Sequence, residues 1–311
     1  MHQQNWITAP DGYIGEVDLS TQFSGSHFNK EHESTDTVID IENVTHYGKE
    51  DYIIRGDDGD NVIKSDAGDD KLYGGKGNDT LSSGTGDDEI YGEGGNDTII
   101  QNGSGTQLYD GGEGVDTYVL DLEDWSFQDS FIGEVNLTTE FSGVHLNPNH
   151  ILNDTVLNFE NITLRGDVDF KIIGDENDNV IKSDAGDDKL YGGKGNDTLS
   201  SGAGNDEIYG EDGNDTLIHQ GSGAQIFDGG EGVDTYEMHQ QNWTTAPDGY
   251  LGLVDLSAEF SGNNHDRDHP LTDRVIGIEN VTHYGNEDHI IRGDDGDNVI
   301  KSGAGDDKLY G

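Results

Sequence analysis

The sequence has no cysteine, four prolines and only 16 basic residues among 311. Without cysteine no disulfide can staple the chain, and the redox compartment stays undetermined. The 16 basic residues face 65 acidic ones, so the formal net charge is −49. A surface this acidic repels nucleic acid and anionic membranes and attracts cations. No apolar run approaches the length of a transmembrane span.

Apolar side chains are also scarce, at 30% of the residues, and the mean hydropathy is −0.75. A thick hydrophobic core is therefore excluded. Such a composition is typical of disorder, because burial cannot offset chain entropy and like charges repel one another. A disordered acidic spacer is thus one interpretation of this chain, and it predicts no response to calcium. The order of the residues favours another.

Long internal repeats organise the chain. The segment KSDAGDDKLYGGKGNDTLSS begins at Lys64 and again at Lys182, an offset of 118 residues. A segment that begins at Met1 returns, almost unchanged, at Met238. The chain therefore holds two full units of about 118 residues and a third that stops early. Because Gly311 falls inside a glycine-rich run, we expect the chain to be a piece of a longer array.

A shorter period of nine residues runs inside each unit. From Gly56 the chain divides into GDDGDNVIK, SDAGDDKLY, GGKGNDTLS, SGTGDDEIY, GEGGNDTII and QNGSGTQLY, then Asp110 as an extra residue, and GGEGVDTYV begins at Gly111. The second unit repeats this, with Asp228 as its extra residue. We expect repeat blocks over 56–118, 174–236 and 293–311, separated by inter-block segments over 1–55, 119–173 and 237–292.

Each nine-residue row should form half a coil. Its first six residues are turn formers that tolerate positive φ. Its last three form a short strand with one inward apolar side chain, namely Ile63, Leu72, Leu81, Ile90, Ile99 and Leu108. Two rows then complete one coil, and coils stack at the ~4.8 Å spacing of paired strands. The predicted fold class is all-β, a parallel β-roll or β-solenoid whose blocks are joined by irregular β segments.

The turns of such a coil bring aspartates together. Asp70 and Asp88 lie two rows apart on one edge, and Asp79 and Asp97 do the same on the other. Carboxylates ~5 Å apart repel by several kcal/mol at an effective dielectric near 20. Ca²⁺ accepts six to eight oxygens, including main-chain carbonyls, whereas Mg²⁺ holds its waters and demands octahedral geometry. The pattern therefore predicts calcium between consecutive turns.

The rows at Gly74 and Gly192 fit the pattern G-G-x-G-x-D-x-U-x in full. The chain resembles the RTX, or hemolysin-type calcium-binding, repeat family. The resemblance implies a right-handed parallel β-roll with calcium ions stacked in its turns. It implies sixth-position ligands at Asp70, Asp79, Asp88, Asp97, Asp116, Asp188, Asp197, Asp206, Asp215, Asp234 and Asp307. It also implies carbonyl ligands from turn glycines, among them Gly75, Gly77, Gly84, Gly86, Gly193, Gly195, Gly202 and Gly204.

Several rows depart from the pattern. Asparagine holds the sixth position in the first row of each block, at Asn61, Asn179 and Asn298, where we expect weaker sites. Thr106 and Ala224 replace the aspartate in the sixth rows, which should end one edge of the ion stack. The extra residues that follow weaken the prediction of an ion beside Asp116 or Asp234. The acids at fifth positions are interpreted as solvated rather than ligating, namely Asp60, Asp69 and Asp87.

The inter-block segments alternate like half-buried strands, as in IGEVDLSTQFSG from Ile14. His46 and His283 recur there and could bind a transition metal, but solvated side chains are the simpler interpretation. The sequons at Asn43, Asn161 and Asn280 are interpreted as structural asparagines rather than glycosylation sites. The tryptophans are interpreted as packing anchors rather than sugar platforms, namely Trp6, Trp125 and Trp243.

Together these features predict a non-enzymatic, calcium-dependent structural module of a secreted bacterial surface protein, such as a stalk, fibre, adhesin or surface layer. The family resemblance implies type I export of a chain that stays unfolded in low calcium and folds outside the cell. Calcium is the expected partner, with neighbouring copies of the chain as further candidates. The alternative is an accessory module of a secreted RTX enzyme, such as a protease, lipase or alginate epimerase.

Overall fold

The computed structural model describes most of the chain. The described residues are 14–19, 23–29, 32–38, 41–122, 132–138, 141–144, 153–239, 251–257, 260–266, 269–286 and 288–311. Within these ranges the secondary structure is strand and turn without helix. It follows that no described helix is long and apolar enough to cross a membrane. The three tryptophans lie outside these ranges.

The chain forms two compact units. The first comprises residues 1–124 and 139–163, and the second comprises residues 125–138 and 164–311. The boundary falls within β16 (Asn161–Arg165). The strands of the first unit are β1 (Ile14–Asp18), β2 (Phe23–Asn29), β3 (His32–Val38), β4 (Asn43–Thr45), β5 (Asp51–Arg55), β6 (Val62–Lys64), β7 (Lys71–Lys76), β8 (Thr80–Ser83), β9 (Glu89–Gly94), β10 (Thr98–Gln101), β11 (Leu108–Asp110), β12 (Thr117–Asp121), β14 (Phe141–Val144) and β15 (Asn153–Leu157).

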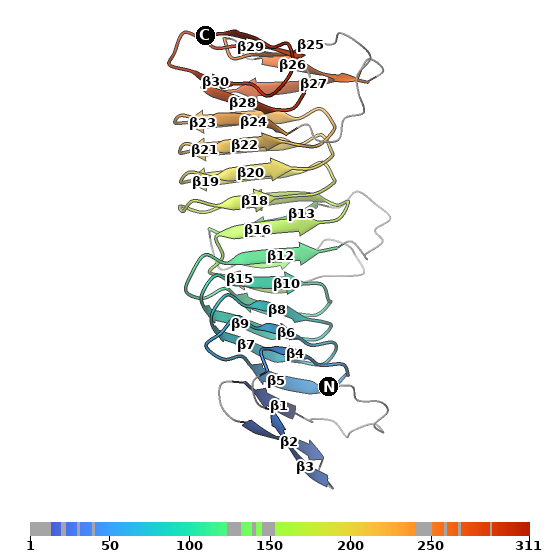
Figure 1. Ribbon diagram of the computed structural model, residues 1–311. Coiled ribbons are helices and arrows are strands. Elements are labelled where there is room, and N and C mark those ends of the chain that lie inside the picture. The colour runs from blue at the N-terminus through green and yellow to red at the C-terminus, as the bar shows by residue number, and fades with distance from the viewer. Residues whose placement is uncertain are drawn as a thin grey trace. The chain divides into compact units, whose positions relative to one another are not determined.

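Two parallel stacks of strands make up the repeat block of the first unit. One stack runs β5-β7-β9-β11 and the other runs β4-β6-β8-β10-β12 (Figure 1). Each strand pairs with the strand two rows later, so that Leu72 lies beside Ile90 and Leu81 beside Ile99. These four side chains are fully buried between the stacks. Two rows per coil, in a parallel β-roll, are therefore confirmed, and a disordered spacer is not what the chain forms.

The second unit repeats this arrangement. Its strands are β13 (Ile132–Asn136), β17 (Asp169–Ile173), β18 (Val180–Lys182), β19 (Lys189–Lys194), β20 (Thr198–Ser201), β21 (Glu207–Asp212), β22 (Thr216–His219), β23 (Ile226–Glu231), β24 (Thr235–His239), β25 (Leu251–Asp255), β26 (Phe260–Asp266), β27 (His269–Ile276), β28 (Asn280–Tyr284), β29 (Asp288–Arg292), β30 (Val299–Lys301) and β31 (Lys308–Tyr310). Leu190 pairs with Ile208 in one stack and Leu199 with Leu217 in the other.

The sixth rows differ from the predicted register. Tyr109, and not Leu108, pairs with Ile90 and is fully buried, while Leu108 is only half-buried. The extra residue is therefore not Asp110 but Gln101, which extends β10 of the fifth row. A strand that slips by one residue turns its other face inward, so the larger tyrosine ring fills the core.

The second unit makes the same change of register in its sixth row. Phe227 pairs with Ile208 and is fully buried, whereas Ile226 is half-buried. The extra residue is therefore His219 and not Asp228. The true sixth rows are NGSGTQLYD and QGSGAQIFD, which keep glycine at their second and fourth positions.

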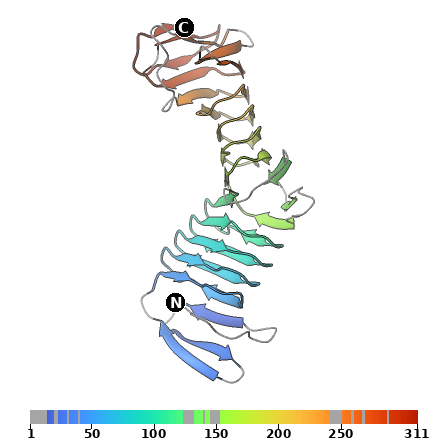
Figure 2. The same cartoon turned by 90° about the vertical axis from the view of Figure 1, so that its right-hand side faces the viewer.

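The inter-block segments also contribute coils. β1 pairs in parallel with β5, β13 with β17 and β25 with β29. Each segment then adds an antiparallel hairpin, formed by β2 and β3, by β14 and β15, and by β26 and β27. In Figure 2 the blue-to-teal coils of the first unit follow one another as separate rungs above such a hairpin.

Candidate metal centre

The sixth-position aspartates are buried although they carry charge. Those of the two complete blocks are 0–1% exposed, namely Asp70, Asp79, Asp88, Asp97, Asp116, Asp188, Asp197, Asp206, Asp215 and Asp234. Asp307 in the third block is half-buried. Carboxylates are almost never fully buried unless they are paired or coordinate a metal. Their surroundings therefore decide what they do.

One carboxylate oxygen of each aspartate is used by the main chain. The N–H of Asp70 donates to Oδ1 of Asp88 at 2.8 Å, and the N–H of Asp197 donates to Oδ1 of Asp215 at 2.7 Å. The same bond joins Asp97 to Asp116 at 2.7 Å. Each bond spans one full coil, so the parallel register of the strands sets where every carboxylate points.

The other oxygen faces the turn. On the edge formed by the odd-numbered rows, buried Oδ2 has no hydrogen-bond partner at Asp79, Asp97, Asp116, Asp197, Asp215 and Asp234. Unpaired buried carboxylate oxygens are costly and call for a cation or a proton.

A carbonyl oxygen of the next coil converges on the same place. A methyl group added at Gly74 would lie 2.3 Å from Oδ2 of Asp79 and 2.7 Å from the carbonyl oxygen of Gly92. Gly192 stands in the same relation to Asp197 and to the carbonyl oxygen of Gly210. Carboxylate and carbonyl oxygens that face a common space form the hard donor set that suits Ca²⁺.

Burial changes the charge state of these groups in the metal-free coil. It raises the pKa of Asp79 to about 6, and the nearby charge of Asp97 adds to the rise. It likewise raises the pKa of Asp88 and of Asp197 to about 7. An added positive charge would remove this penalty, because it favours the ionised form.

Two further features shape the turns. Gly75 and Gly77 have φ near 110°, a region that side chains rarely adopt, and Gly193 and Gly195 repeat these angles. Gly84 needs no unusual φ, but a methyl group there would lie 1.6 Å from the carbonyl oxygen of Asp66. The remaining turn glycines predicted to ligate lie at equivalent turn positions, namely Gly86, Gly202 and Gly204.

The asparagines that begin the blocks behave differently from the aspartates. Oδ1 of Asn61 accepts the N–H of Asp57 at 2.8 Å, within its own turn, and its Nδ2 donates to the carbonyl oxygen of Glu42 at 3.0 Å. Asn179 and Asn298 accept from Asp175 and Asp294 in the same way, each at 2.8 Å. A neutral amide already engaged in its own turn is a poor calcium ligand, so weaker sites at these asparagines remain a prediction.

Glutamine holds the sixth position in the sixth rows, so the prediction of Thr106 and Ala224 there is wrong. Nε2 of Gln107 donates to Oδ2 of Asp88 at 3.3 Å and to the carbonyl oxygen of Gly84 at 3.2 Å. Nε2 of Gln225 donates to the carbonyl oxygen of Gly202 at 3.1 Å. An uncharged amide thus engages the turn oxygens on this edge. Thr106 and Ala224 lie one position earlier because the inserted residue precedes them.

The odd-numbered edge continues to the seventh row despite the insertion. Oδ1 of Asp116 accepts a hydrogen bond from the N–H of Asp97, and Oδ1 of Asp234 accepts one from the N–H of Asp215 at 2.8 Å. The N–H of Asp116 then donates to Oε2 of Glu160 at 2.8 Å, and that of Asp234 to Glu279 at 2.7 Å. The inserted residue therefore does not remove these two aspartates from the stack.

Four acids of the inter-block segments, which the nine-residue pattern does not predict, extend the stacks. Glu160 and Glu279 are two of them. The other two are Asp154 and Asp273, which accept the N–H of Gln107 and Gln225 at 3.0 Å each. A signal for Asp154 was present, because Asn-Asp-Thr-Val from Asn153 has the same form as Asn-Asp-Thr-Ile from Asn96.

The fifth-position acids are exposed, as predicted, but they also bond to the main chain. Asp60, Asp69 and Asp87 accept the N–H of the fifth residue two rows later, at 2.7–2.9 Å. Among the sequons, Oδ1 of Asn43 accepts the N–H of Val62 at 3.0 Å, and Oδ1 of Asn280 accepts that of Val299 at 2.9 Å. These bonds agree with structural asparagines.

Comparison with known protein families identifies these rows. The model of the RTX calcium-binding nonapeptide repeat (4 copies) matches residues 53–81, 73–100, 171–199, 191–220 and 284–311. These are RTX calcium-binding nonapeptide repeats. In the first two blocks the matched segments end before or at the start of the sixth row, where glutamine replaces aspartate. No curated protein matches the chain. These RTX repeats indicate a calcium-binding repeat module.

Proposed function

We propose that the chain is a calcium-gated structural module, whose ions are held by the sixth-position carboxylates and the carbonyl oxygens of the glycine turns. The observation that carries this is the row of buried Oδ2 atoms without hydrogen-bond partners on the odd-numbered edge, from Asp79 to Asp116 and from Asp197 to Asp234. Calcium would supply positive charge between carboxylates that the parallel register holds in place.

The proposed ligands follow the rows. They are Asp70, Asp79, Asp88, Asp97, Asp116, Asp188, Asp197, Asp206, Asp215, Asp234 and Asp307, with Asn61, Asn179 and Asn298 at weaker sites. We propose that the blocks over 56–118, 174–236 and 293–311 respond to calcium together with the inter-block segments that extend their sheets. The hydrogen bonds from Asp116 to Glu160 and from Asp234 to Glu279 support this coupling.

The proposed setting is extracellular. Extracellular calcium modules commonly bind at ~10⁻⁴–10⁻³ M. A chain with such affinity would be unfolded where calcium is scarce and folded where it is abundant, because ion binding and folding are coupled. We propose that the module is secreted unfolded and serves as a non-enzymatic stalk, fibre, adhesin or surface layer, in which neighbouring copies can associate.

Circular dichroism in EGTA, followed by titration with CaCl₂, tests the calcium gate. We expect a spectrum of a disordered chain in EGTA and a cooperative gain of β signal as calcium rises, with a much weaker effect of MgCl₂. A full β signal after exhaustive chelation would contradict the proposal.

A further inference from the structure

Three potential metal ligands of a different kind meet at the start of the third block. They are His283 in β28, His289 in β29 and Asp307 just before β31. One ligand atom from each lies within 4.8 Å of the other two. The histidines are 2% and 3% exposed, and their ring centroids are 4.0 Å apart. The interpretation of His283 as a solvated side chain is therefore wrong.

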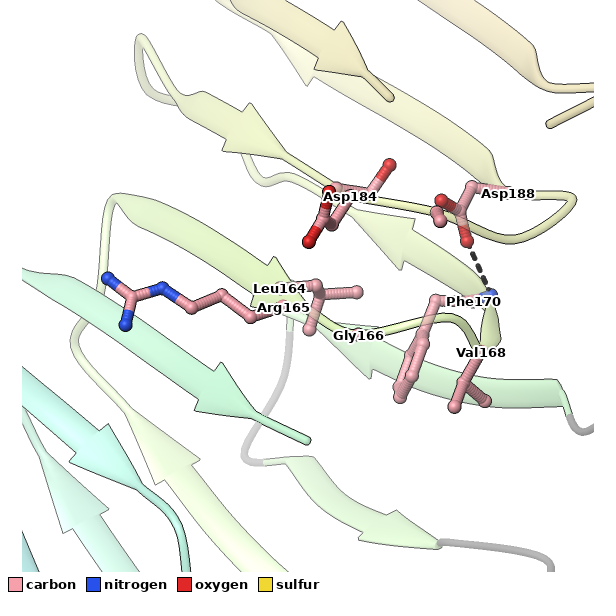
Figure 3. Close-up of a pocket in the computed structure, with 9 residues that line it drawn as sticks. Leu164, Arg165, Gly166, Val168, Phe170, Asp184 and Asp188 are labelled. Atoms are coloured by element: carbon pink, nitrogen blue, oxygen red, sulfur yellow. Dashed lines mark hydrogen bonds between the residues drawn. The ribbon is translucent and has the colours of Figure 1, made fainter. Parts of the chain in front are cut away.

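The long repeat occurs in three copies, which carry the blocks over 56–118, 174–236 and 293–311. The equivalent place in the middle copy is apolar. Leu164 and Phe170 stand where His283 and His289 stand, and both are buried beside Asp188 (Figure 3). The N–H of Phe170 donates to Oδ1 of Asp188 at 2.8 Å, as the N–H of His289 donates to Oδ1 of Asp307 at 2.9 Å. The fold therefore accepts leucine and phenylalanine here, and packing does not require two imidazoles.

The first copy is intermediate. His46 lies against Tyr52, with ring centroids 3.9 Å apart, and the N–H of Tyr52 donates to Oδ1 of Asp70 at 2.7 Å. It offers one imidazole and one carboxylate, whereas the third copy offers two imidazoles and one carboxylate. The three copies thus form a natural series in which the backbone bonds are kept and the number of nitrogen ligands is zero, one or two.

We propose that His283, His289 and Asp307 bind a divalent transition-metal ion of the zinc class, at a site that takes Asp307 from the row of proposed calcium ligands and adds two imidazoles. Two imidazoles and a carboxylate are a known ligand set of Zn²⁺, whereas Ca²⁺ prefers oxygen alone. With bond lengths of ~2.0–2.2 Å, ligand atoms around a tetrahedral ion lie ~3.3–3.6 Å apart. The three ligand atoms, which lie within 4.8 Å of one another, would close to that spacing around the ion, and water would complete the coordination.

The site depends on the folded coil. β28 and β29 belong to different sheets, and the carboxylate of Asp307 is oriented by a main-chain bond across one coil. The three ligands come together only when these strands are stacked. Zinc would therefore bind the calcium-folded chain and stabilise the entry to the third block, since a ligand that binds only the folded state favours it.

Co²⁺ spectroscopy on the tag-free full chain in saturating calcium tests this site. We expect the visible absorption of a tetrahedral Co²⁺ site, saturating at one equivalent and lost on addition of one equivalent of Zn²⁺. The double variant H283L/H289F reproduces the residues of the middle copy and should weaken Zn²⁺ binding by about 100-fold or more. The control His46→Leu should bind as the wild type does.

A calcium titration by circular dichroism accompanies each variant, so that loss of folding and loss of the zinc site are separated. If the double variant folds poorly, His289→Tyr, which reproduces the first copy, replaces it. Absence of stoichiometric Co²⁺ binding in the calcium-folded chain would overturn the proposal. Unchanged binding in a folded variant that lacks one or both of the histidines would do so as well.

Discussion

The main-chain N–H of Asp79 donates to Oδ1 of Asp97 at 2.7 Å across one full coil. This bond fixes one oxygen of a buried carboxylate and leaves the other, Oδ2, facing the turn without a hydrogen-bond partner. The backbone register therefore orients each carboxylate, and the same register holds neighbouring carboxylates close enough to repel one another. Orientation and repulsion arise from one geometry, which explains how a thin core can be coupled to a cation.

Removing one buried charge should weaken calcium binding. Asp197→Asn keeps an acceptor for the N–H of Asn179, a bond of 2.8 Å, but replaces Oδ2 by a donor that faces the turn. We expect a higher calcium midpoint and a loss of about 1–3 kcal/mol in the free energy of unfolding at saturating calcium. Asp187→Asn is the matched control, because asparagine occurs naturally at that fifth position in other rows. Equal calcium midpoints for the two variants, measured by circular dichroism, would contradict the assignment.

Filling the space beside a carboxylate should weaken calcium binding, because the added atoms displace the carboxylate. In Gly74→Ala the added methyl group would lie 2.3 Å from Oδ2 of Asp79. Displacing that carboxylate should cost about 1–3 kcal/mol and lower the number of ions bound. In Gly94→Ala the nearest atom is 3.9 Å away, so this variant should resemble the wild type. Calorimetric titration with calcium measures both variants, and an unchanged ion count in Gly74→Ala would argue against a site there.

Lowering the pH should partly substitute for calcium in stabilising the folded chain. Burial raises the pKa of Asp88, Asp188 and Asp197 to about 7 in the folded, metal-free chain, from an ordinary value of 3.8. A raised carboxyl pKa means that the folded state binds more protons, so its stability rises as pH falls from about 7 toward 4. In EGTA we expect more β signal at pH 5 than at pH 8. More β signal at pH 8 than at pH 5 in the metal-free chain would contradict this prediction.

The glutamine of the sixth row should limit the number of ions. Gln107→Asp removes the amide that bonds to Asp88 and Gly84 and places a carboxylate at a sixth position of the register. We expect the calcium count by native mass spectrometry to rise by one per chain. Gln107→Asn, which keeps a neutral amide, is the control and should not gain an ion. An unchanged count in Gln107→Asp would mean that this edge ends for another reason.

Much of this architecture could be predicted from the sequence, because a nine-residue period with one inward aliphatic leaves few ways to stack a chain. The pairing of Leu72 with Ile90 and the burial of the sixth-position aspartates follow from that period. The position of the extra residue did not follow. The glycine pattern favours Gln101, because NGSGTQLYD keeps glycine at its second and fourth positions, whereas the aliphatic Leu108 at an inward position favours Asp110. The packing of Tyr109 in the core decides between them.

The sequence by itself determined the repeat, the parallel coils and the oxygen-rich turns, since these depend on contacts between residues at a fixed separation along the chain. Only the tertiary structure decided which side chains from other parts of the chain join the candidate sites. Glu160 joins the stack above Asp116, and His283 meets His289 and Asp307, because strands from the inter-block segments lie beside the rows. The nine-residue repeat does not predict such contacts, because they depend on where the irregular segments rejoin the sheets.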